Sequence, residues 1–354
     1  MKNSTYRLSL FQYVKFYYAI QHFWVKTILK PLPKKDYPVL DTFSFVSVWL
    51  QYVMDKSIVS MRDLFQRLNN QGIDLKISNF SKASKKRDTQ VFLEIITELN
   101  NQLRKKKGKE ETQALFPIDS TIITLTSKLL WSQGYHQVKL FCGLDSLTSE
   151  VGGMVIHFGQ GHDHKYGQET VEAIPSKGVG IMDRGFASSE RISELKQQKN
   201  KAFVLRIKNN VTLEMLENGN CKVGKDEREV EIRVVAFCDI ETKSEFRLAT
   251  NLLNEGEEQV SNQEIMEIYI QRWQIELLWK FLKMHLKLDR LMTKNENGIR
   301  IQIMCCLIAY LILQLIEIPQ EFGKTLLDKL RYLQSYMCQE ISYVHWFRKL
   351  IWIR

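Results

Sequence analysis

The stretch ALFPIDSTIITL, residues 114–125, marks the point where the pattern of the chain changes from helical to strand-like. It is rich in β-branched residues, which favour strands. Two further strand-like stretches follow, HQVKLFCGLD at 136–145 and GGMVIHFG at 152–159. GVGIMDRGF at 178–186 and KAFVLRIK at 201–208 then alternate with a helix expected at about 188–199. Three hairpin-like strands followed by alternating helix and strand predict an α/β fold, a mixed sheet with helices packed on it.

Two acids, Asp119 and Asp183, each come directly after an apolar run in a strand expected in the middle of this sheet. A buried, unpaired carboxylate is costly, so each acid must find a partner, become neutral or bind a metal at the edge of the sheet. Taken singly, either acid could simply cap or turn the chain at a strand end. The occurrence of two in the same position favours a shared site.

Residues 209–258 indicate a β-rich insertion without a catalytic signature of its own. Its clearest strands are REVEIRVVAF at 228–237 and FRLATNLL at 246–253. Turn-forming residues punctuate it at ENGN, 217–220, and around Gly224.

The stretch YIQRWQIELLWKFLK, residues 269–283, has the apolar spacing of an amphipathic helix. On a straight helix of 100° per residue, five polar side chains fall within an arc of about 80°. They are Tyr269, Arg272, Glu276, Lys280 and Lys283, and Lys287 is expected to continue the strip. The expected flanks are apolar, with Trp273, Leu277 and Met284 on one side and Trp279 and Leu286 on the other.

This narrow strip has two interpretations. It could be an exposed stripe of ion pairs, because Glu276 and Lys280 form a favourable i, i+4 pair. Alternatively, Glu276 could hold a metal while the tyrosine and the basic residues hold phosphates on either side of it. The apolar flanks favour the second interpretation, since an ordinary solvated face is wider and bordered by polar residues.

The net charge of +10 is confined to the first third of the chain. Residues 1–112 contain 20 Lys and Arg against 10 Asp and Glu, whereas residues 113–354 contain 30 of each kind. This segregation predicts a polyanionic partner for the N-terminal region. Residues 60–88 resemble a helix-turn-helix, with a break at Gly72 and a second helix carrying Lys82, Lys85, Lys86 and Arg87. Many solvated helix pairs share that pattern.

Two other polar stretches have plain interpretations. RKKKGKEE, residues 104–111, is expected to be a solvated linker that marks the first domain boundary, with phosphate contacts as an additional role. GQGHDHKYG, residues 159–167, resembles a metal cluster at first sight, but no fourth ligand follows at a suitable spacing. It is therefore expected to be a loop near the active face.

The remaining composition fits an ordinary cytoplasmic protein. The six cysteines form no CxxC pair, so neither a zinc site nor a disulfide framework is indicated. No signal peptide is apparent in the first residues. The most apolar stretch, IQIMCCLIAYLILQLIEI at 301–318, has an unbroken apolar run of only 11 residues. A spanning helix needs roughly 20, so this stretch is predicted to be a buried helix.

The spacing of Tyr269, Arg272, Glu276 and Lys283 resembles the YREK signature of the DDE transposases in insertion sequence family four. Asp119 in IDST and Asp183 in MDRGF match the first and second acids of that family's catalytic triad. The match covers residues 114–287, while the N-terminal third resembles the family only in being helical and basic.

The resemblance implies a ribonuclease H-like mixed-sheet core with a β-strand insertion, preceded by an all-α N-terminal domain. The expected parts are a helical basic DNA-binding domain at 1–112, the first part of the core at 113–208, the insertion at 209–258, and the core completion with C-terminal helices at 259–354. Asp119, Asp183 and Glu276 would bind two Mg²⁺ ions, with Mn²⁺ as a substitute.

The implied reaction is cleavage of double-stranded DNA at the terminal inverted repeats, followed by strand transfer into target DNA. Tyr269, Arg272, Lys280 and Lys283 would hold phosphates, and Arg184 is a weaker candidate for the same role. A homodimer on DNA, in a prokaryotic cytoplasm and on the nucleoid when bound, is also implied, with no membrane partner.

The chain departs from the family in the aromatic residues of its insertion. Members that form a DNA hairpin are expected to stack a flipped base on an aromatic residue of the insertion, and Phe237 and Phe246 are the only aromatics there. Two other functions stay open at this stage. A ribonuclease H-like nuclease or resolvase should lack the Tyr-Arg-Lys strip, and a catalytically silent DNA-binding relic should have lost an acid.

Overall fold

The computed structural model describes residue 32 and residues 36–70, 74–108, 113–125, 134–198, 200–217, 220–223, 229–238, 245–253 and 259–337. It divides the chain into two compact units. One unit comprises Met1–Gln102 together with Leu282–Arg354, and the other comprises Leu103–Phe281. The domain boundaries drawn from the sequence stay predictions, although this grouping places described residues of the N-terminal and C-terminal parts in the same unit.

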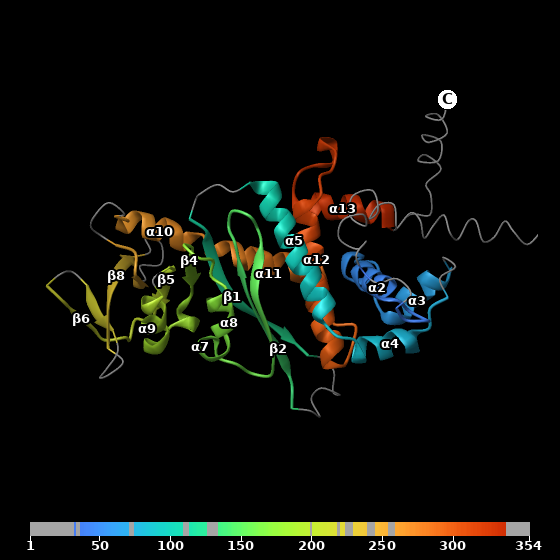
Figure 1. Ribbon diagram of the computed structural model, residues 1–354, viewed down its shortest axis with the longest axis horizontal. Coiled ribbons are helices and arrows are strands. Elements are labelled where there is room, and N and C mark those ends of the chain that lie inside the picture. Colours follow the sequence, from blue (N-terminus) through green and yellow to red (C-terminus); the bar gives the residue numbers. More distant parts are fainter. Residues whose placement is uncertain are drawn as a thin grey trace, which may run out of the picture. The chain divides into compact units, whose positions relative to one another are not determined.

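The central unit is built on a large mixed sheet (Figure 1). Its first five strands are β1 (Leu115–Thr124), β2 (Gln137–Leu144), β3 (Val151–Phe158), β4 (Val179–Met182) and β5 (Ala202–Ile207). They lie in the order β3-β2-β1-β4-β5. The first three strands pair antiparallel, whereas β4 is parallel to both β1 and β5. The predicted mixed α/β sheet is confirmed, and this arrangement is consistent with the expected ribonuclease H-like core.

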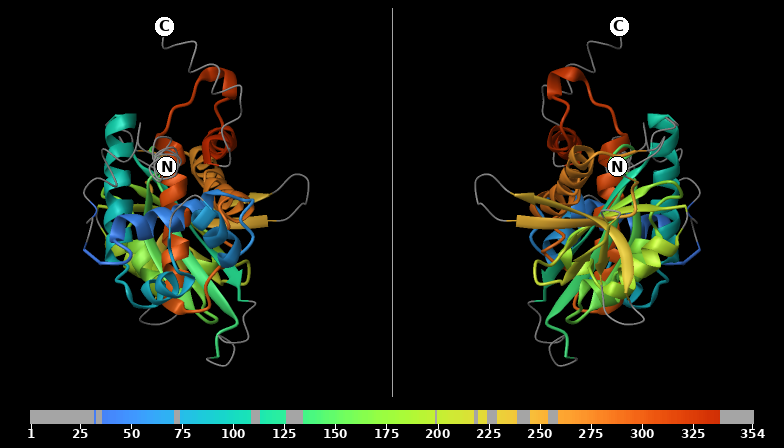
Figure 2. Two further views of the ribbon diagram at one scale, coloured as in Figure 1. Left: turned by 90° about the vertical axis from the view of Figure 1, so that its right-hand side faces the viewer. Right: turned by 90° about the vertical axis from the view of Figure 1, so that its left-hand side faces the viewer.

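The insertion extends the same sheet. Its strands are β6 (Leu213–Met215), β7 (Cys221–Val223), β8 (Val230–Cys238) and β9 (Glu245–Thr250), all paired antiparallel. Because β9 pairs with β5, the described strands form a nine-stranded sheet in the order β3-β2-β1-β4-β5-β9-β8-β7-β6. β8 and β9 form a yellow and orange hairpin in Figure 2. The two strands expected in the insertion are therefore present.

Helices cover both faces of this sheet. The short helices α7 (Asp163–Tyr166) and α8 (Gln168–Glu172), the turn η2 (Arg184–Phe186) and the helix α9 (Ser189–Gln197) lie on one face. The core beneath them contains Ile118 and Phe141 from the strands. The helix α10 (Asn262–Ile270) packs on the other face, where Ile265 and Tyr269 meet Val179. Burial of apolar surface on both faces explains why β4 and β5 are almost entirely apolar.

The other unit is helical in its described residues. Its elements are α2 (Thr42–Met54), α3 (Met61–Asn70), α4 (Ile77–Lys86), the first part of α5 (Gln90–Lys107), α12 (Glu296–Leu315), η4 (Gln320–Phe322) and α13 (Leu326–Met337). Phe80 contacts the rings of Phe45, Trp49 and Phe65 at the centre of the N-terminal helices. Since α2 and α4 also pack on α12, an independent all-α N-terminal domain is not confirmed.

The helix α12 contains the most apolar stretch of the chain, and the prediction that it is buried is confirmed. It is the one described helix that is long and apolar enough to cross a membrane by length and composition alone. Of its most apolar window, 89% is buried inside the protein, as in the core helix of a globular domain. Asn295 caps its N-terminus by accepting a hydrogen bond from the amide of Gly298.

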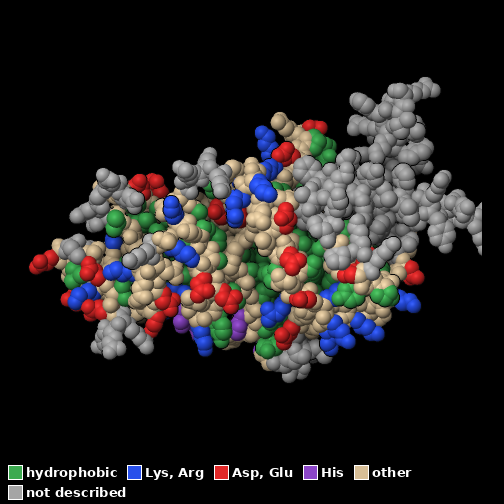
Figure 3. All heavy atoms as spheres, viewed as in Figure 1, with side chains coloured by type: hydrophobic (Ala, Val, Ile, Leu, Met, Phe, Trp, Pro, Cys, Tyr) green, Lys and Arg blue, Asp and Glu red, His purple; other side chains and the backbone are tan. Residues whose placement is uncertain are grey.

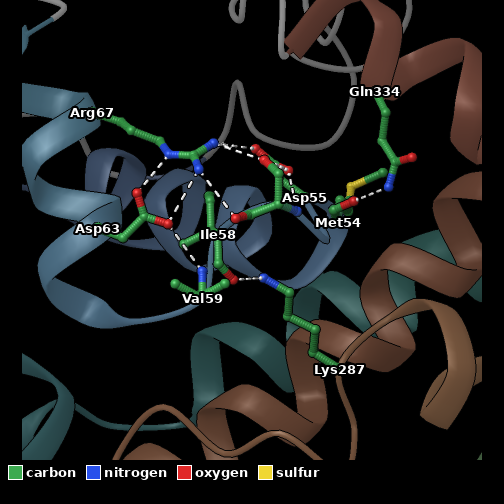
Figure 4. A network of polar contacts seen from close by, with 9 residues as sticks. Met54, Asp55, Ile58, Val59, Asp63, Arg67, Lys287 and Gln334 are labelled. Atoms are coloured by element: carbon green, nitrogen blue, oxygen red, sulfur yellow. Dashed lines mark hydrogen bonds and ion pairs between the residues drawn. The ribbon is translucent and has the colours of Figure 1, made fainter.

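A polar network stabilises the helical unit around Lys287 (Figure 4). The prediction that Lys287 continues the polar strip is wrong, because the helix before it ends at His285 and Lys287 adopts a left-handed backbone with φ of 57°. Its side chain is buried, donates to the carbonyl of Ile58 at 2.6 Å and lies over the ring of Tyr52. Nearby, Arg67 pairs with Asp63 at 2.8 Å.

The segment RKKKGKEE is not a linker in its first half. The helix α5 continues to Lys107, so residues 104–107 are helical, and residues 109–111 lie outside the described part of the chain. Arg104 pairs with Glu150 at 2.6 Å, and Lys107 donates to the carbonyl of Leu147. The positive charges of these lysines and arginines also stabilise the C-terminal end of α5, where the helix dipole is negative.

Candidate active site

The register between β1 and β4 places the two predicted aspartates beside each other. The last pair of these parallel strands is Ile118 with Met182, and an aspartate follows each of them, Asp119 and Asp183. Neighbouring strands lie about 4.8 Å apart. The two acids therefore stand side by side, Asp119 in the middle of β1 and Asp183 directly after the carboxyl end of β4.

Both acids point to the face covered by α10. Successive side chains of a strand alternate between faces, and Ile118 and Met182 belong to the core on the α9 side. Asp119 and Asp183 follow them directly and so lie on the opposite face. A hydrogen bond agrees with this placement of Asp183, because the hydroxyl of Tyr269 in α10 donates to its carboxylate at 3.3 Å.

Asp119 lies in the middle of β1 and is largely desolvated. Burial raises the pKa of Asp119 from its ordinary value of 3.8 to about 6. The negative charges of Glu276 and Asp163 raise this pKa further, while Arg272 lowers it. The carboxylates of Asp119 and Glu276 are therefore close enough to repel each other.

Asp183 is surrounded by groups that stabilise its negative charge. In addition to Tyr269, Arg206 of β5 approaches it, with its guanidinium nitrogen 3.9 Å from the carboxylate. Burial raises the pKa of Tyr269 to about 12, and the charge of Asp183 contributes to the same direction. The tyrosine therefore stays protonated at neutral pH and can act as a hydrogen-bond donor.

The stretch 269–283 is not one straight helix, as the sequence interpretation assumed. The helix α10 ends at Ile270, a turn contains Gln271 and Arg272, and the helix α11 (Trp273–His285) follows. Arg272 donates to Glu276, in the first turn of α11, at 2.6 Å. Burial lowers the pKa of Arg272, but this hydrogen bond and the negative charges of Glu276 and Asp183 together raise that pKa. The ion pair observed for Glu276 is thus with Arg272.

The apolar flanks of α11 differ from each other. Trp279 and Leu286 are buried, but Trp273 is 58% exposed and Leu277 is 49% exposed. Both flanks of the polar strip are apolar, as expected, but only the flank formed by Trp279 and Leu286 is buried. Periodicity distinguishes apolar from polar faces, but it cannot tell which apolar face is covered by the rest of the protein.

The donor set formed by Asp119, Asp183 and Glu276 suits a hard divalent cation, because Mg²⁺ prefers carboxylate oxygens. Within the described residues, no group of three His, Cys, Asp or Glu side chains lies close enough to hold a metal as they stand. Two of the three carboxylates are instead paired with cations, Glu276 with Arg272 and Asp183 with Arg206. A metal would have to take over from these cations.

The other predicted phosphate contacts of the strip lie on α11 or next to Asp183. Lys280 is exposed and Lys283 is half-buried, both on α11. Arg184 is exposed in η2, directly after Asp183. All three have access to solvent, which a contact with DNA requires.

The predicted helix-turn-helix corresponds to α3 and α4, while its break at Gly72 lies outside the described residues. Lys82, Lys85 and Lys86 are exposed on α4. Figure 3 shows Lys and Arg side chains gathered over this helix. Arg87 differs from them, because its guanidinium donates to the carbonyl of Leu40 and lies over the ring of Phe45. Its role in the structure is thus packing, contrary to the sequence interpretation.

Three residues near the acids were missed at the level of sequence. They are Arg206 in β5, Lys139 in β2 and Asp163 at the start of α7. Arg206 and Lys139 each interrupt an apolar strand with a charge, which is the signal that identified Asp119 and Asp183. Asp163 had no such signal, since it lies among histidines in a polar loop.

The sequence profile of the family described as "Transposase DDE domain" matches residues 110–312. A protein of Synechocystis sp. (strain ATCC 27184 / PCC 6803 / Kazusa), named as a transposase for insertion sequence element IS4SA, is 59% identical over 329 residues, which are 92% of this chain and 97% of that protein. The chain belongs to the DDE transposases. The predicted resemblance to insertion sequence family four is thereby confirmed.

More distant relatives carry similar names. A protein of Geobacillus stearothermophilus, named as a transposase for insertion sequence element IS5377, is 28% identical over 241 residues, which are 62% of this chain and 60% of that protein. The transposase y4zB of Sinorhizobium fredii (strain NBRC 101917 / NGR234) is 26% identical over 249 residues, 66% of this chain and 69% of that protein. The function of this DDE transposase is transposition. Its family acts on DNA and uses divalent metal ions.

Proposed function

We propose that this transposase cuts double-stranded DNA at the terminal inverted repeats of its element and joins the cut ends to target DNA. The catalytic residues are Asp119, Asp183 and Glu276. The supporting observation is the register of β1 and β4, which places the two aspartates side by side on the α10 face, with Glu276 near enough to affect the pKa of Asp119.

The three carboxylates would hold two Mg²⁺ ions, or Mn²⁺ in their place. When bound, such a pair supplies a clamp that activates the attacking oxygen and stabilises the leaving oxygen of an in-line displacement. The protein contributes the fixed spacing of Asp119 and Asp183, because both extend from paired strands of a packed sheet. Glu276 is released for this role when Arg272 turns from the carboxylate to a DNA phosphate.

The residues around the acids position the DNA strand. Tyr269 stays protonated at neutral pH, so its hydroxyl can donate to a phosphate oxygen when it turns away from Asp183. Arg272 can bind a phosphate through two parallel hydrogen bonds, which fixes orientation as well as distance. Lys280, Lys283 and Arg184 attract neighbouring phosphates. Lys82, Lys85 and Lys86 on α4 bind other phosphates of the DNA.

A hairpin intermediate is less well supported than cleavage. Phe237 and Phe246 stack on each other with ring centroids 5.7 Å apart, and Phe246 also contacts the ring of Tyr269. These aromatics of the insertion are therefore occupied by packing. The exposed indole of Trp273, next to Arg272, is the aromatic surface on which a base can stack.

According to this proposal, the protein acts as a homodimer on DNA. It is located in the prokaryotic cytoplasm, and on the nucleoid when it is bound to DNA. A simple ribonuclease H-like nuclease is the second candidate, because it would use the same acids. Retention of Tyr269, Arg272 and Lys283 next to Glu276 favours the transposase, which must hold a cut end for the joining step. A silent relic is disfavoured because all three acids are present.

The experiment compares the full-length protein with Asp119→Asn, Asp183→Asn and Glu276→Gln on DNA carrying the inverted repeats. Each variant should lose Mg²⁺-dependent cleavage while its DNA affinity stays within about twofold, because the basic residues of α4 are unchanged. Cleavage near the parent rate by any one variant would remove that residue from the proposed site. Cleavage without joining by the parent protein would favour the simple nuclease.

A further inference from the structure

The carboxylate of Asp163 lies on the opposite face of the sheet from the proposed catalytic acids, directly behind them. Ser120 follows Asp119 in β1, so its side chain points away from the α10 face. Its hydroxyl donates to the Oδ1 atom of Asp163 at 2.7 Å. Asp163 belongs to α7, which packs on that face beside η2.

The same carboxylate also contacts the turn that follows Asp183. A Cβ atom added to Gly185 would lie 2.5 Å from the Oδ2 atom of Asp163, and the three nearest atoms all belong to that side chain. Real Cβ atoms do not approach so closely, so Gly185 leaves the space that Asp163 fills. One carboxylate therefore touches the residue next to Asp119 and a residue two positions after Asp183.

Asp163 is itself held firmly. The Lys139 ammonium, from β2, lies 2.7 Å from its Oδ1 atom and also donates to the carbonyl of Gly161 at 2.8 Å. The Lys139 side chain is only 11% exposed, so solvent screens this ion pair less than one on the surface. Arg191 of α9 donates to the carbonyl of His164, which anchors the short helix α7 a second time.

We infer that Asp163 is a positioning residue that fixes the spacing of Asp119 and Asp183 from behind the sheet. It does so through Ser120 in β1 and through Gly185 in η2, the turn that follows β4. Asp163 is not itself a metal ligand in this arrangement, because Oδ1 already accepts from Ser120 and Lys139 and Oδ2 is packed against Gly185. The inference rests on the proposed function, since it assigns a role toward the metal that Asp119 and Asp183 would hold.

The spacing of two ligands determines how well both can bind one cation, and supporting residues of metal sites typically contribute 10-fold to 100-fold in affinity. The affinity of the full-length, DNA-free protein for Mn²⁺ is therefore measured by calorimetry. Asp163→Ala and Ser120→Ala should each weaken Mn²⁺ binding by roughly 10-fold or more, while Ser120→Thr, which keeps the hydroxyl, should restore most of it.

Gly185→Ala provides a second, independent test. The added methyl group should displace Asp163 and weaken Mn²⁺ binding, but it should cost little more in the Asp163→Ala background, where the colliding atoms are gone. Additive losses in the double variant would overturn the inference. Glu169→Gln removes an exposed acid from α8 and is the matched control, with unchanged Mn²⁺ affinity expected. Melting curves verify folding, and Ser120→Ala carries the test if Asp163→Ala does not fold.

Asp119→Asn is titrated in the same series to separate the two proposals. If Asp119→Asn binds Mn²⁺ as the parent does, the proposed metal site is wrong. If Asp119→Asn loses affinity while Asp163→Ala and Ser120→Ala bind as the parent does, only the role of Asp163 is wrong. Loss of affinity in all three, with the hydroxyl rescue by Ser120→Thr, supports both.

Discussion

The burial of Asp119 predicts that the metal-free protein becomes more stable when this proposed catalytic acid is neutralised. The pKa of Asp119 in the folded protein, about 6, lies above its ordinary value of 3.8. The folded protein therefore holds a proton that the unfolded chain has released between these pH values. The contribution of Asp119 to the free energy of unfolding is therefore fully present below about pH 4 and is lost as the pH rises through about 6.

The size of the effect follows from the difference between the two pKa values. A change from 3.8 to about 6 corresponds to roughly 3 kcal/mol, at about 1.4 kcal/mol for each tenfold change in proton affinity. Asp119→Asn removes this cost at pH 8 while keeping the size of the side chain. With about 2 °C of melting temperature per kcal/mol for a protein of this size, the variant should melt about 6 °C higher in the presence of a chelator.

The assay is a pair of melting curves, at pH 8 and at pH 5, for the parent and Asp119→Asn. The advantage of the variant should shrink at pH 5, where Asp119 of the parent is largely protonated. Added Mg²⁺ should raise the melting temperature of the parent more than that of the variant. Asp183→Asn is the control and should melt lower than the parent, because it weakens the contacts with Tyr269 and Arg206. Equal melting of Asp119→Asn and the parent at both pH values would refute the reasoning.

Replacing Lys82, Lys85 and Lys86 together by Gln should flatten the slope of log affinity against log salt by about 3, measured by fluorescence anisotropy with end DNA. Arg272→Lys should keep Mn²⁺ affinity but lose at least tenfold in cleavage rate, because an ammonium cannot bind a phosphate bidentately. The pKa of the buried Lys287 is lowered from 10.5 to about 8 by burial, so its favourable contribution is present above pH 10 and lost as pH falls through 8. Urea unfolding should thus favour the parent over Lys287→Met more at pH 10 than at pH 7.

The strands could be predicted from the sequence because burial on both faces demands long apolar runs, and the runs at 178–186 and 201–208 are of that kind. Their alternation with helices also predicted the mixed directions of the sheet. The register between β1 and β4 could not be predicted in the same way. It depends on backbone hydrogen bonds between residues about 64 positions apart, for which a single sequence contains no pattern.

The candidate site was predictable only where a charge interrupts an apolar pattern. Asp119 and Asp183 stand out for that reason, and Arg206 and Lys139 satisfy the same criterion. The residues next to Asp163 in the sequence are polar, so its charge does not stand out. Its proposed positioning role depends on tertiary packing against Gly185. Arg87 was misassigned for the converse reason, because a basic residue in a basic run gives no sign that it packs on an aromatic ring.

The break between α10 and α11 determines how the side chains of Tyr269 and Arg272 lie relative to each other. At the break the backbone forms hydrogen bonds of the i to i−3 type, from the amide of Arg272 to the carbonyl of Tyr269 and from that of Ile275 to the carbonyl of Arg272. Such bonds tighten the turn to three residues, so that side chains three apart lie in line with one another, whereas a straight α-helix would separate them by about 60°. The Arg272 guanidinium accordingly lies over the Tyr269 ring, 5.7 Å from its centroid. On the proposed function, this alignment lets one phosphate reach both side chains once they turn from Asp183 and Glu276. The sequence spacing of the two residues thus serves the proposed role although the straight helix is not present.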